Sequence, residues 1–318
     1  MNAAPRLTIG LPVYNGEKYL AESLDALLGQ SYSDFELVIS DNASTDSTEE
    51  ICRDYLARDS RISYYRQPVN IGATPNHNWT FEHSHGELFK WASYDDLYGR
   101  DLLKRCIEAL DDDPGLVLAH AYQAIIDAAG DIVLKVDYPL NTEDPHAPER
   151  FRSLLMTVGG DDFYGVMRSD VLRRTPLNGS YHHSDRTIMA EMALYGRFHQ
   201  VPELLFFRRD HPDRAERAKP TIRSRSANME PRRASRLRNA GRMTKAIRLS
   251  SRKYPASIPK PLITSSWCEY TMPSETRVGQ ASPRNTWTRI SERPNRCRAF
   301  SHRPARPVSI RPMKPAFR

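Results

Sequence analysis

Cysteine is scarce and scattered in this 318-residue chain. Its four cysteines, at positions 52, 106, 268 and 297, lack the spacing of a zinc site or a disulfide framework, and such usage fits a reducing compartment. No apolar run approaches the roughly 20 residues that a membrane-spanning helix needs. The N-terminus also lacks the charged and apolar segments of a signal peptide. We therefore expect a cytoplasmic protein that lies at most peripherally at the inner face of the cell membrane.

Aspartate is absent from the last hundred residues, where the charge of the chain reverses. Residues 219–318 hold 24 lysines and arginines against 4 glutamates, whereas residues 1–218 hold 22 basic and 35 acidic side chains. The last hundred residues also contain 12 of the 23 prolines and show little helical periodicity. We therefore expect one folded domain at residues 1–217, followed at 218–318 by a basic Pro/Arg/Ser-rich tail that buries no core and is disordered.

Three interpretations of this tail are open. A basic arm could hold the protein on anionic lipid, in a peripheral membrane contact. Basic charge alone also gives nonspecific affinity for nucleic acids, but the tail has no interleaved aromatic residues or folded motif, so we expect no specific nucleic acid partner. The favoured interpretation is translation out of frame after about residue 240, because excess Arg, Pro and Ser with vanishing Asp is typical of a GC-rich gene read in the wrong frame.

Strands and helices alternate along the predicted domain. Four apolar runs predict buried strands: residues 7–11, 35–40, 62–66 and 88–92. An apolar stripe predicts a helix after the first strand: Leu20, Leu24, Leu27 and Leu28. Ser47 and Glu50 match a capping box that opens a second helix. Later strands are predicted at residues 116–122, 198–201 and 204–207. This alternation predicts an α/β fold with a doubly wound, mostly parallel sheet.

Polar clusters follow three of the predicted strands, and ligands of such sheets bind beyond the carboxyl ends of the strands. The clusters are Pro12 to Asn15, Asp41 to Ser44, and Ser93 to Asp96. Adjacent carboxylates raise each other's pKa at the end of a buried strand unless a cation offsets them. Asp95 and Asp96 therefore predict a divalent metal site that also touches phosphate. The alternatives are a helix cap or solvated loop for Asp95 and Asp96, a turn or helix-capping aspartate for Asp41, and a plain turn for Asn15-Gly16.

The order and spacing of these motifs resemble the inverting nucleotide-sugar glycosyltransferases of the GT-A fold, the family 2 type. The resemblance extends over roughly residues 7–210 and rests on several motifs rather than one. Its motifs are Pro12-Val13-Tyr14-Asn15-Gly16, Ser40-Asp41-Asn42-Ala43-Ser44-Thr45-Asp46, Asn70-Ile71-Gly72 through Asn78, Gly86-Glu87, and the Asp95-Asp96 strand end. The resemblance implies a GT-A domain and an enzyme that uses a nucleotide-diphosphate sugar donor.

For the donor, the resemblance implies a nucleotide lying across the first two strand ends. Pro12, Tyr14 and Asn15 would line the base and ribose pocket. Asp41 would bind a polar edge of the base, with Asn42 and Ser44 beside it. His77 stands where the family often has an arginine.

For the metal, the family has the motif Asp, any residue, Asp, whereas this chain has Ser93-Tyr94-Asp95 followed by Asp96. The metal role therefore falls mainly on Asp95, with Asp96 as its neighbour and Tyr94 beside the nucleotide. Mg²⁺ or Mn²⁺ would bridge the diphosphate oxygens and offset the charge on the leaving group. The run from Arg208 to His211 resembles the element that covers the diphosphate in the family, so His211 is a candidate phosphate or metal contact.

For the acceptor, the family places its general base, usually within a Glu-Asp pair, where this chain has Ser184 and Asp185. Asp185 would deprotonate the acceptor hydroxyl. The alternative is a helix cap, because an acid at a helix N-terminus is favoured by the dipole. His182 and His183 are either pocket residues or solvated loop residues.

These expectations describe a metal-dependent enzyme that transfers a hexosyl or deoxyhexosyl group with inversion. Its acceptor would be a glycolipid or saccharide of the cell envelope. The missing acid at Ser93 motivates a second hypothesis, a nucleotide-sugar-binding protein without turnover. A nucleotidyltransferase is disfavoured, because no Gly-rich, Lys-bearing loop follows the first strand.

Overall fold

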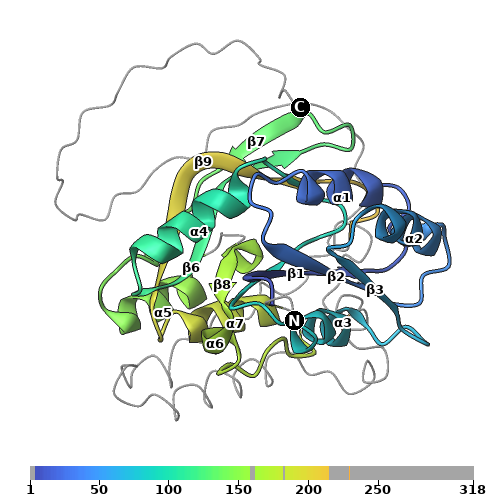
Figure 1. Ribbon diagram of the computed structural model, residues 1–318. Coiled ribbons are helices and arrows are strands. Elements are labelled where there is room, and N and C mark those ends of the chain that lie inside the picture. The colour runs from blue at the N-terminus through green and yellow to red at the C-terminus, as the bar shows by residue number, and fades with distance from the viewer. Residues whose placement is uncertain (1–3, 158–161, 182, 215–228, 230–318) are drawn as a thin grey trace, which may run out of the picture. The chain divides into compact units, whose positions relative to one another are not determined.

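The apolar runs of the chain form the strands of a single sheet in the computed structural model, which describes residues 4–157, 162–181, 183–214 and 229. Within these residues the sheet has nine strands in the order β3-β2-β1-β4-β8-β6-β9-β5, and β7 pairs with β6 (Figure 1). The strands are β1 (Leu7–Val13), β2 (Phe35–Asp41), β3 (Ile62–Arg66), β4 (Leu88–Trp91), β5 (Leu97–Tyr98), β6 (Leu116–Ile126), β7 (Ile132–Val136), β8 (Val166–Arg168) and β9 (Arg197–Arg209).

The first four strands, β3-β2-β1-β4, are all parallel. Beyond β4 the sheet is mixed: β8 runs antiparallel to β4 and β6, β9 runs parallel to β6, and β5 runs antiparallel to β9. The predicted α/β sheet is therefore confirmed, with its parallel character concentrated in the first half. The carboxyl ends of β1, β2 and β4 lie at one edge, where the three polar clusters follow them.

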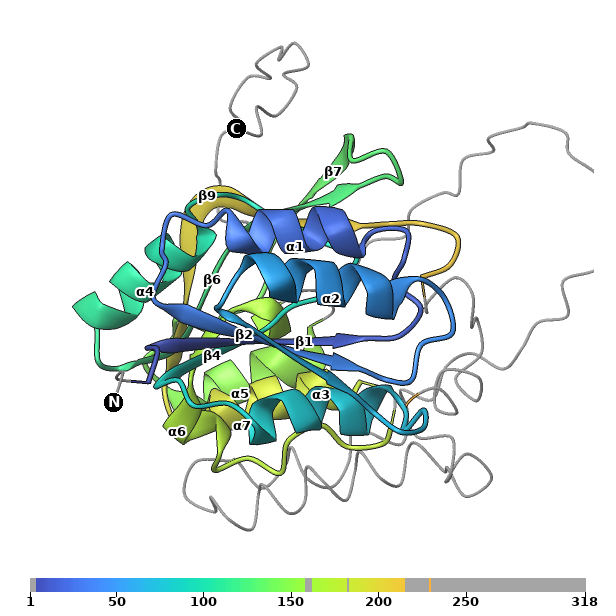
Figure 2. The same ribbon diagram turned by 45° about the vertical axis from the view of Figure 1, so that its right-hand side comes forward.

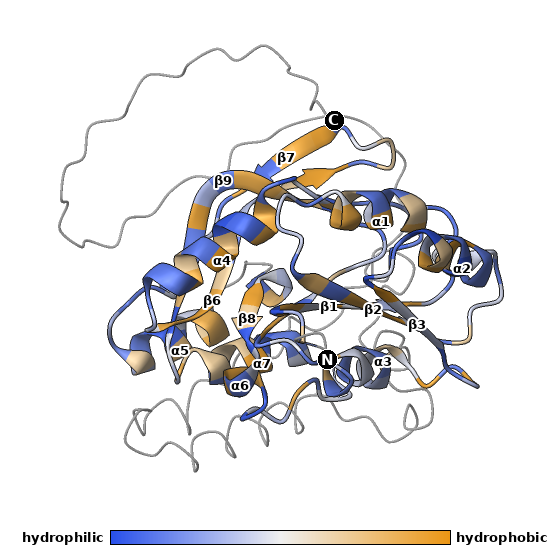
Figure 3. Ribbon diagram, viewed as in Figure 1, coloured by the Kyte–Doolittle hydropathy of each residue, from blue (hydrophilic) through white to orange (hydrophobic). Residues whose placement is uncertain are grey.

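Helices cover both faces of the sheet, with α1 and α2 on one face and α3, α6 and α7 on the other (Figure 2). The helices are α1 (Leu20–Leu28), α2 (Thr48–Arg58), α3 (Ala73–Glu82), α4 (Leu102–Asp112), α5 (Ala147–Met156), α6 (Ser169–Leu172) and α7 (Ser184–Met192), with a 3₁₀ turn η1 (Asp162–Tyr164). The predicted stripe on α1 points inward, because Leu20, Leu24 and Leu27 are fully buried. In Figure 3 hydrophobic residues predominate along β6 and β8, and the helices α1 and α4 carry both hydrophobic and hydrophilic residues.

Two local predictions were wrong. The predicted strands at 198–201 and 204–207 are one strand, β9, because its pairing with β6 shifts register between Val201 and Leu204 and so accommodates Pro202, which has no N–H to donate. The predicted capping box is also absent: the side chain of Ser47 makes no cap hydrogen bond. Asp46 replaces it, since its Oδ1 accepts the backbone N–H of Thr48 at 3.1 Å.

No helix in the described part of the chain combines the length and the apolar character that crossing a bilayer requires. The predicted tail at 218–318 lies outside the described residues, apart from Met229. The domain boundary at residue 217 and the three interpretations of the tail therefore stay predictions.

Candidate functional site

The loop after β1 and the loop after β2 are joined by hydrogen bonds between side chain and backbone. The N–H of Asn15 donates to Ser44 Oγ at 2.9 Å, and Asn15 Oδ1 accepts the N–H of Thr45 at 2.9 Å. Next to them, the N–H of Gly16 donates to Thr48 Oγ1 at 2.8 Å. Asn15 has a left-handed backbone, with φ 52°, a conformation that asparagine tolerates better than most residues. The two predicted nucleotide loops thus form one rigid edge.

Tyr94 brings the third strand end against this edge. A Cβ added to Gly16 would lie 2.9 Å from the ring of Tyr94, so only glycine permits this close approach. Burial raises the pKa of the Tyr94 phenol, which therefore stays neutral. Tyr14 differs, because 40% of its surface is exposed whereas Pro12 is buried. Of these residues, Tyr14 and Asn15 offer the accessible surface.

Asp41 lies beneath the surface, with its carboxylate held by the protein. Its Oδ1 accepts the N–H of Ser44 at 2.9 Å, and its Oδ2 accepts the hydroxyl of Tyr64 and the guanidinium of Arg66, both at 2.8 Å. The Asp41 side chain is 0% exposed. In this arrangement Asp41 ties β2 to β3 at their carboxyl ends.

The Asn42 side chain is also held by hydrogen bonds within the protein. Its amide nitrogen donates to Asn70 Oδ1 at 3.1 Å, and its amide oxygen accepts the N–H of Ile71 at 2.8 Å. Asn42 therefore fixes the loop that leads into α3. Asn70, in turn, accepts the N–H of Gly72 at 2.9 Å.

Asp95 is buried and bound by three side chains. One oxygen accepts the hydroxyl of Ser93, and the other lies 3.0 Å from His211 Nε2 and 3.7 Å from Arg214 Nη1. Burial alone would raise the pKa of Asp95, but the hydrogen bond from His211 and the charge of Arg214 outweigh it, so the pKa lies below its usual value. Ser93, which replaces the family's first acid, thus orients the remaining one.

Asp96 and Arg209 connect this loop to the end of β9. Asp96 is fully buried, and its Oδ1 accepts the backbone N–H of Arg209 at 2.9 Å. The Arg209 side chain, 1% exposed, donates to the carbonyl oxygen of Asp95 at 3.0 Å and to Glu22 at 2.5 Å. Its guanidinium lies 4.7 Å from the centre of the Tyr19 ring. Arg209, which belongs to the run from Arg208 to His211, thus supports the acidic loop through buried contacts.

Arg214 is a site residue that sequence reasoning missed. It contacts Asp96 Oδ1 at 3.3 Å as well as Asp95. Its Nη1 also donates to the carbonyl oxygen of Arg209 at 2.6 Å. The only signal in the sequence was one more arginine, three residues after His211, in a run already rich in charge.

The fit of a divalent cation depends on Asp95 and His211. No group of three or more His, Cys, Asp or Glu side chains within the described residues is arranged to hold a metal ion. Asp95 and His211 nevertheless pair a carboxylate with an imidazole, and the buried His211 Nδ1 has no hydrogen-bond partner among the described residues. Such a donor set suits a cation that takes its other ligands from phosphate and water.

Asp185 lies apart from these buried acids, exposed in the first turn of α7. Its Oδ1 accepts the N–H of Arg186 at 2.9 Å. Burial lowers the pKa of His77, and the negative charge of Asp185 partly opposes that shift, so the two residues lie within electrostatic range. The His77 carbonyl accepts Trp91 Nε1 at 3.0 Å, which ties this region to β4. His182 lies outside the described residues.

The neighbouring Arg186 anchors the start of α7. Its Nη2 donates to the carbonyl oxygen of Thr157 at 2.7 Å, and its Nη1 lies 4.0 Å from Asp162. Ser184, at the family's Glu position, is buried and donates its hydroxyl to Asn178 at 3.2 Å. Asp185 is therefore the acid of this turn that solvent can reach.

Among curated sequences, the chain is similar to several bacterial proteins that are named as glycosyltransferases. It is 30% identical over 140 residues to an uncharacterized glycosyltransferase of Haemophilus influenzae, a match that covers 42% of this chain and 56% of the relative. It is 36% identical over 98 residues to the putative glycosyltransferase EpsE of Bacillus subtilis, covering 30% and 35%. The chain thus spans just over half the length of the first relative and about a third of the second.

Solved structures share the fold. The first 349 residues of Staphylococcus aureus TarS, in complex with UDP-GlcNAc, align with a TM-score of 0.56 at 16% identity, covering 81% of this chain and 68% of that one. The mannosyltransferase PcManGT of Pyrobaculum calidifontis, in complex with GDP-Man and Mn²⁺, aligns with a TM-score of 0.50 at 18% identity, covering 81% and 77%. At such identities the likeness concerns the fold.

A family model described as "Glycosyl transferase family 2" establishes the family of this chain. That model matches residues 8–174, which is more than half of the chain and includes all three strand-end clusters. The resemblance seen in the sequence motifs is confirmed, and the chain belongs to glycosyl transferase family 2.

Proposed function

We propose that this protein transfers a sugar from a nucleoside-diphosphate donor to an acceptor hydroxyl, with inversion at the anomeric carbon. The observation that carries the proposal is the joining of three strand ends into one rigid edge, with Tyr94 packed on Gly16 and Asp95 held against His211. Membership of glycosyl transferase family 2 supports the reaction class. The solved structures with the same fold carry nucleotide sugars, UDP-GlcNAc in one and GDP-Man in the other.

The donor would lie along this edge. The exposed ring of Tyr14 and the Asn15 turn form its base and ribose side, with Pro12, Asp41, Asn42 and Ser44 holding the loops in place. Because these loops are joined to each other by hydrogen bonds, little conformational entropy remains to be lost when a nucleotide binds.

Asp95 and His211 are the residues that would hold Mg²⁺ or Mn²⁺, with Asp96 fixing the loop behind them. The bound cation supplies positive charge beside the diphosphate leaving group. Arg214, 3.7 Å from Asp95, adds a fixed positive charge at the same place. The lowered pKa of Asp95 keeps its carboxylate ionised and able to bind a cation.

Asp185 would accept the proton of the acceptor hydroxyl at a carboxylate oxygen. Its exposure gives the acceptor access, and it lies in the first turn of α7. Inversion follows when the activated hydroxyl attacks from the side opposite the diphosphate. Proton transfer by a positioned group of this kind typically contributes about 10² to 10⁴ in rate.

The finer assignments extend the same proposal. The transferred group is a hexose or deoxyhexose, and the acceptor is a glycolipid or saccharide in cell-envelope synthesis. The protein would work in the cytoplasm, with peripheral contact to the anionic inner face of the membrane. The bacterial proteins to which the chain is similar are named as glycosyltransferases, which supports the transfer of a sugar.

A thermal-shift panel tests the donor site. UDP, GDP, dTDP, ADP and CDP are added to the full chain with and without Mn²⁺, and the corresponding nucleotide sugars follow for any diphosphate that binds. We expect a stabilisation by at least one diphosphate that increases with Mn²⁺. The absence of any shift across the panel would contradict the proposal.

The rival function is nucleotide-sugar binding without turnover, which the serine at position 93 favours. Release of nucleoside diphosphate from the sugar donor, in the presence of Mn²⁺ and an acceptor mixture, separates the two. Turnover that is lost in Asp185→Asn supports the enzyme. Binding with no release of diphosphate supports the rival.

A further inference from the structure

Arg66 lies beside Asp41, the residue that the family resemblance assigns to the nucleotide base. It is the last residue of β3, and its side chain is 36% exposed, whereas the Asp41 side chain that it contacts is 0% exposed. The carboxylate expected to bind the base is therefore buried and paired with an arginine. The exposed group beside Asp41 is a hydrogen-bond donor instead of an acceptor.

The contacts of Arg66 hold its guanidinium in a defined orientation. Its Nη1 donates to Asp41 at 2.8 Å, its Nη2 donates to the carbonyl oxygen of Ser44 at 2.9 Å, and its Nε lies 3.3 Å from Glu49. Ser44 also binds Asn15 through its hydroxyl, so Arg66 is linked directly to the nucleotide edge. Because the planar guanidinium is anchored on several sides, its remaining N–H can meet a ligand with little loss of entropy.

A guanidinium discriminates between bases by the groups at their edges. Guanine O6 and uracil or thymine O4 are carbonyl oxygens that accept hydrogen bonds. Adenine N6 and cytosine N4 are amino groups in the corresponding positions, and they present donors. Two donors facing each other leave both unpaired, and a buried unpaired polar group costs more than the hydrogen bond itself would contribute.

We infer that Arg66 determines the base specificity of the donor and selects nucleotides whose base carries a keto oxygen at that edge. Asp41 acts through Arg66 as a positioning residue: it fixes the guanidinium and does not touch the base. This inference rests on the proposed function, since it concerns the nucleotide of the same donor site. Uridine, thymidine and guanosine diphosphates belong to the selected class, and adenosine and cytidine diphosphates to the rejected one.

The experiment measures dissociation constants of UDP, GDP, ADP and CDP with Mn²⁺ for the full chain and its variants by titration calorimetry. For the unmodified protein we expect UDP or GDP to bind at least roughly tenfold more tightly than ADP and CDP, the size of one charge-assisted hydrogen bond. In Arg66→Met the ratio between the dissociation constants of the two nucleotide classes falls to near one, chiefly because UDP or GDP binds more weakly. Arg66→Lys, which lacks the planar guanidinium, retains part of this ratio.

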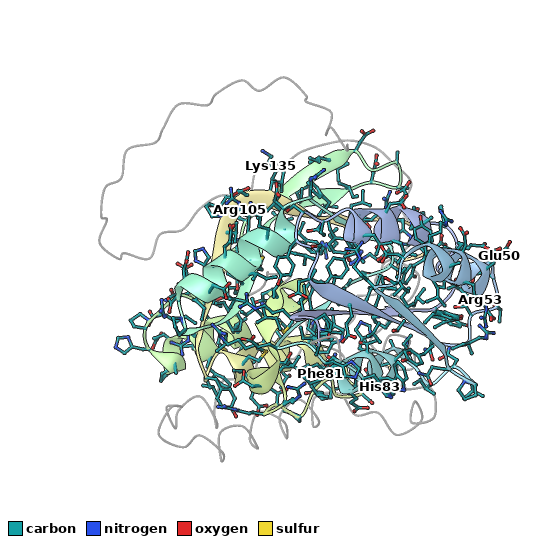
Figure 4. All side chains as sticks on the ribbon, viewed as in Figure 1. Glu50, Arg53, Phe81, His83, Arg105 and Lys135 are labelled. Atoms are coloured by element: carbon teal, nitrogen blue, oxygen red, sulfur yellow. The ribbon has the colours of Figure 1, made fainter. Side chains whose placement is uncertain are left out.

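Arg53→Met is the matched control. Arg53 also binds Glu49, with its Nε 2.9 Å from the carboxylate, and its guanidinium lies 5.6 Å from the centre of the Tyr64 ring. Arg53 differs from Arg66 in its greater exposure, 62% against 36%, near α2 in Figure 4. Its described contacts are to Glu49 and Tyr64, and they do not include Asp41. This variant removes the same charge from the same neighbourhood, and we expect the ratio to stay unchanged.

Arg66→Met leaves the buried Asp41 carboxylate with one partner fewer, and it could lower the stability of the fold. The double variant Asp41→Asn/Arg66→Met removes that charge as well, and we expect it to show the same loss of discrimination. The inference is overturned if Arg66→Met and the double variant weaken all four nucleotides equally, or if the unmodified protein prefers ADP or CDP. If no diphosphate binds the unmodified protein, the proposed function fails as well.

Discussion

The candidate site acids of the parallel half of the sheet and the candidate base of the mixed half are held in opposite ways. In the parallel half, Asp41, Asp95 and Asp96 are all buried, and each is bound by arginine, histidine or backbone groups. In the mixed half, Asp185 is exposed at the start of α7, and its one described hydrogen bond comes from the next residue along the chain.

Burial therefore separates two tasks that look alike in sequence. A buried carboxylate is costly unless charged or hydrogen-bonded partners compensate it, and the three buried acids have such partners and fix their loops. An exposed carboxylate needs no such partners. Under the proposed function, the parallel half would bind the donor with its loops already fixed, and the mixed half would offer Asp185 to the acceptor.

Asp185→Asn should have the largest effect. We expect turnover to fall by about 10² to 10⁴ while nucleotide binding stays unchanged, because the amide keeps the shape of the side chain and removes the proton acceptor. Single-turnover transfer and diphosphate titration measure the two quantities. Asp170→Asn, an exposed acid in the first turn of α6, is the control. An equal loss of nucleotide binding in Asp185→Asn would contradict the separation of donor binding from proton transfer.

Lys90→Met tests the strand β4, where the halves join. Lys90 is fully buried, its amine donates to the carbonyl oxygen of Tyr164, and it lies 5.1 Å from the centre of the Tyr98 ring. Burial lowers the pKa of Lys90 to about 8. The unfolded chain, with the ordinary pKa near 10.4, then binds more protons between pH 8 and 10, so this residue makes stability rise with pH in that window.

The gain in unfolding free energy of Lys90→Met over the unmodified protein should therefore be largest at pH 7. This gain should shrink by about 2 to 3 kcal/mol by pH 10, which urea denaturation at both pH values measures. Lys104→Met, on the exposed side of α4, should show no such change. A difference independent of pH would mean that folding leaves the pKa of this amine unshifted.

Asp95→Asn tests whether the buried acids of the parallel half bind a cation. We expect the stabilisation of nucleotide binding by Mn²⁺ to fall about 10- to 100-fold, because the amide removes the charged ligand and the partner of His211. Titration of UDP or GDP with and without Mn²⁺ measures it. Asp101→Asn, at the N-cap of α4, should leave the titration unchanged. Equal binding in Asp95→Asn and the unmodified protein would exclude a cation at this acid.

The smallest effect concerns the cap of α2, beside the nucleotide edge. Ser47→Ala should change the unfolding free energy by less than about 0.5 kcal/mol, because its side chain makes no cap hydrogen bond. Asp46→Ala should cost about 1 kcal/mol, because Asp46 accepts the N–H groups of Thr48 and Glu17. Thermal or urea unfolding measures the loss of unfolding free energy in each variant. A larger loss in Ser47→Ala than in Asp46→Ala would support the predicted capping box.

Much of the fold could be predicted from the sequence because apolar runs report burial directly. The runs at 35–40, 62–66 and 88–92 lie within one residue of β2, β3 and β4. The strand pair at 198–207 could not be predicted correctly, because a proline normally ends a strand and only the register shift against β6 shows that β9 continues. The cap of α2 was missed because two adjacent residues, Asp46 and Ser47, compete for the same N–H group.

The candidate site divides in the same way. Which residue types follow the strands is a local property, so Asn15, Asp41, Asp95 and Asp185 could be named from motifs, and their catalytic and binding roles stay predictions. The partners of those residues come from distant parts of the chain: Arg66 for Asp41, and Arg209 and Arg214 for the acidic loop. No local pattern connects Asp41 with a residue 25 positions away, or the acidic loop with residues more than a hundred positions away.

The sequence by itself determined the alternation of strands and helices, the edge at which polar residues gather, and the family. These depend on hydrophobic periodicity and on turns, which short stretches of chain encode. Only the tertiary structure decided which acids are buried, which cations neutralise them and which side chain is left to face a ligand. Burial and charge pairing depend on the packing of β3 and β9 against the same loops, and that packing forms only when the chain folds.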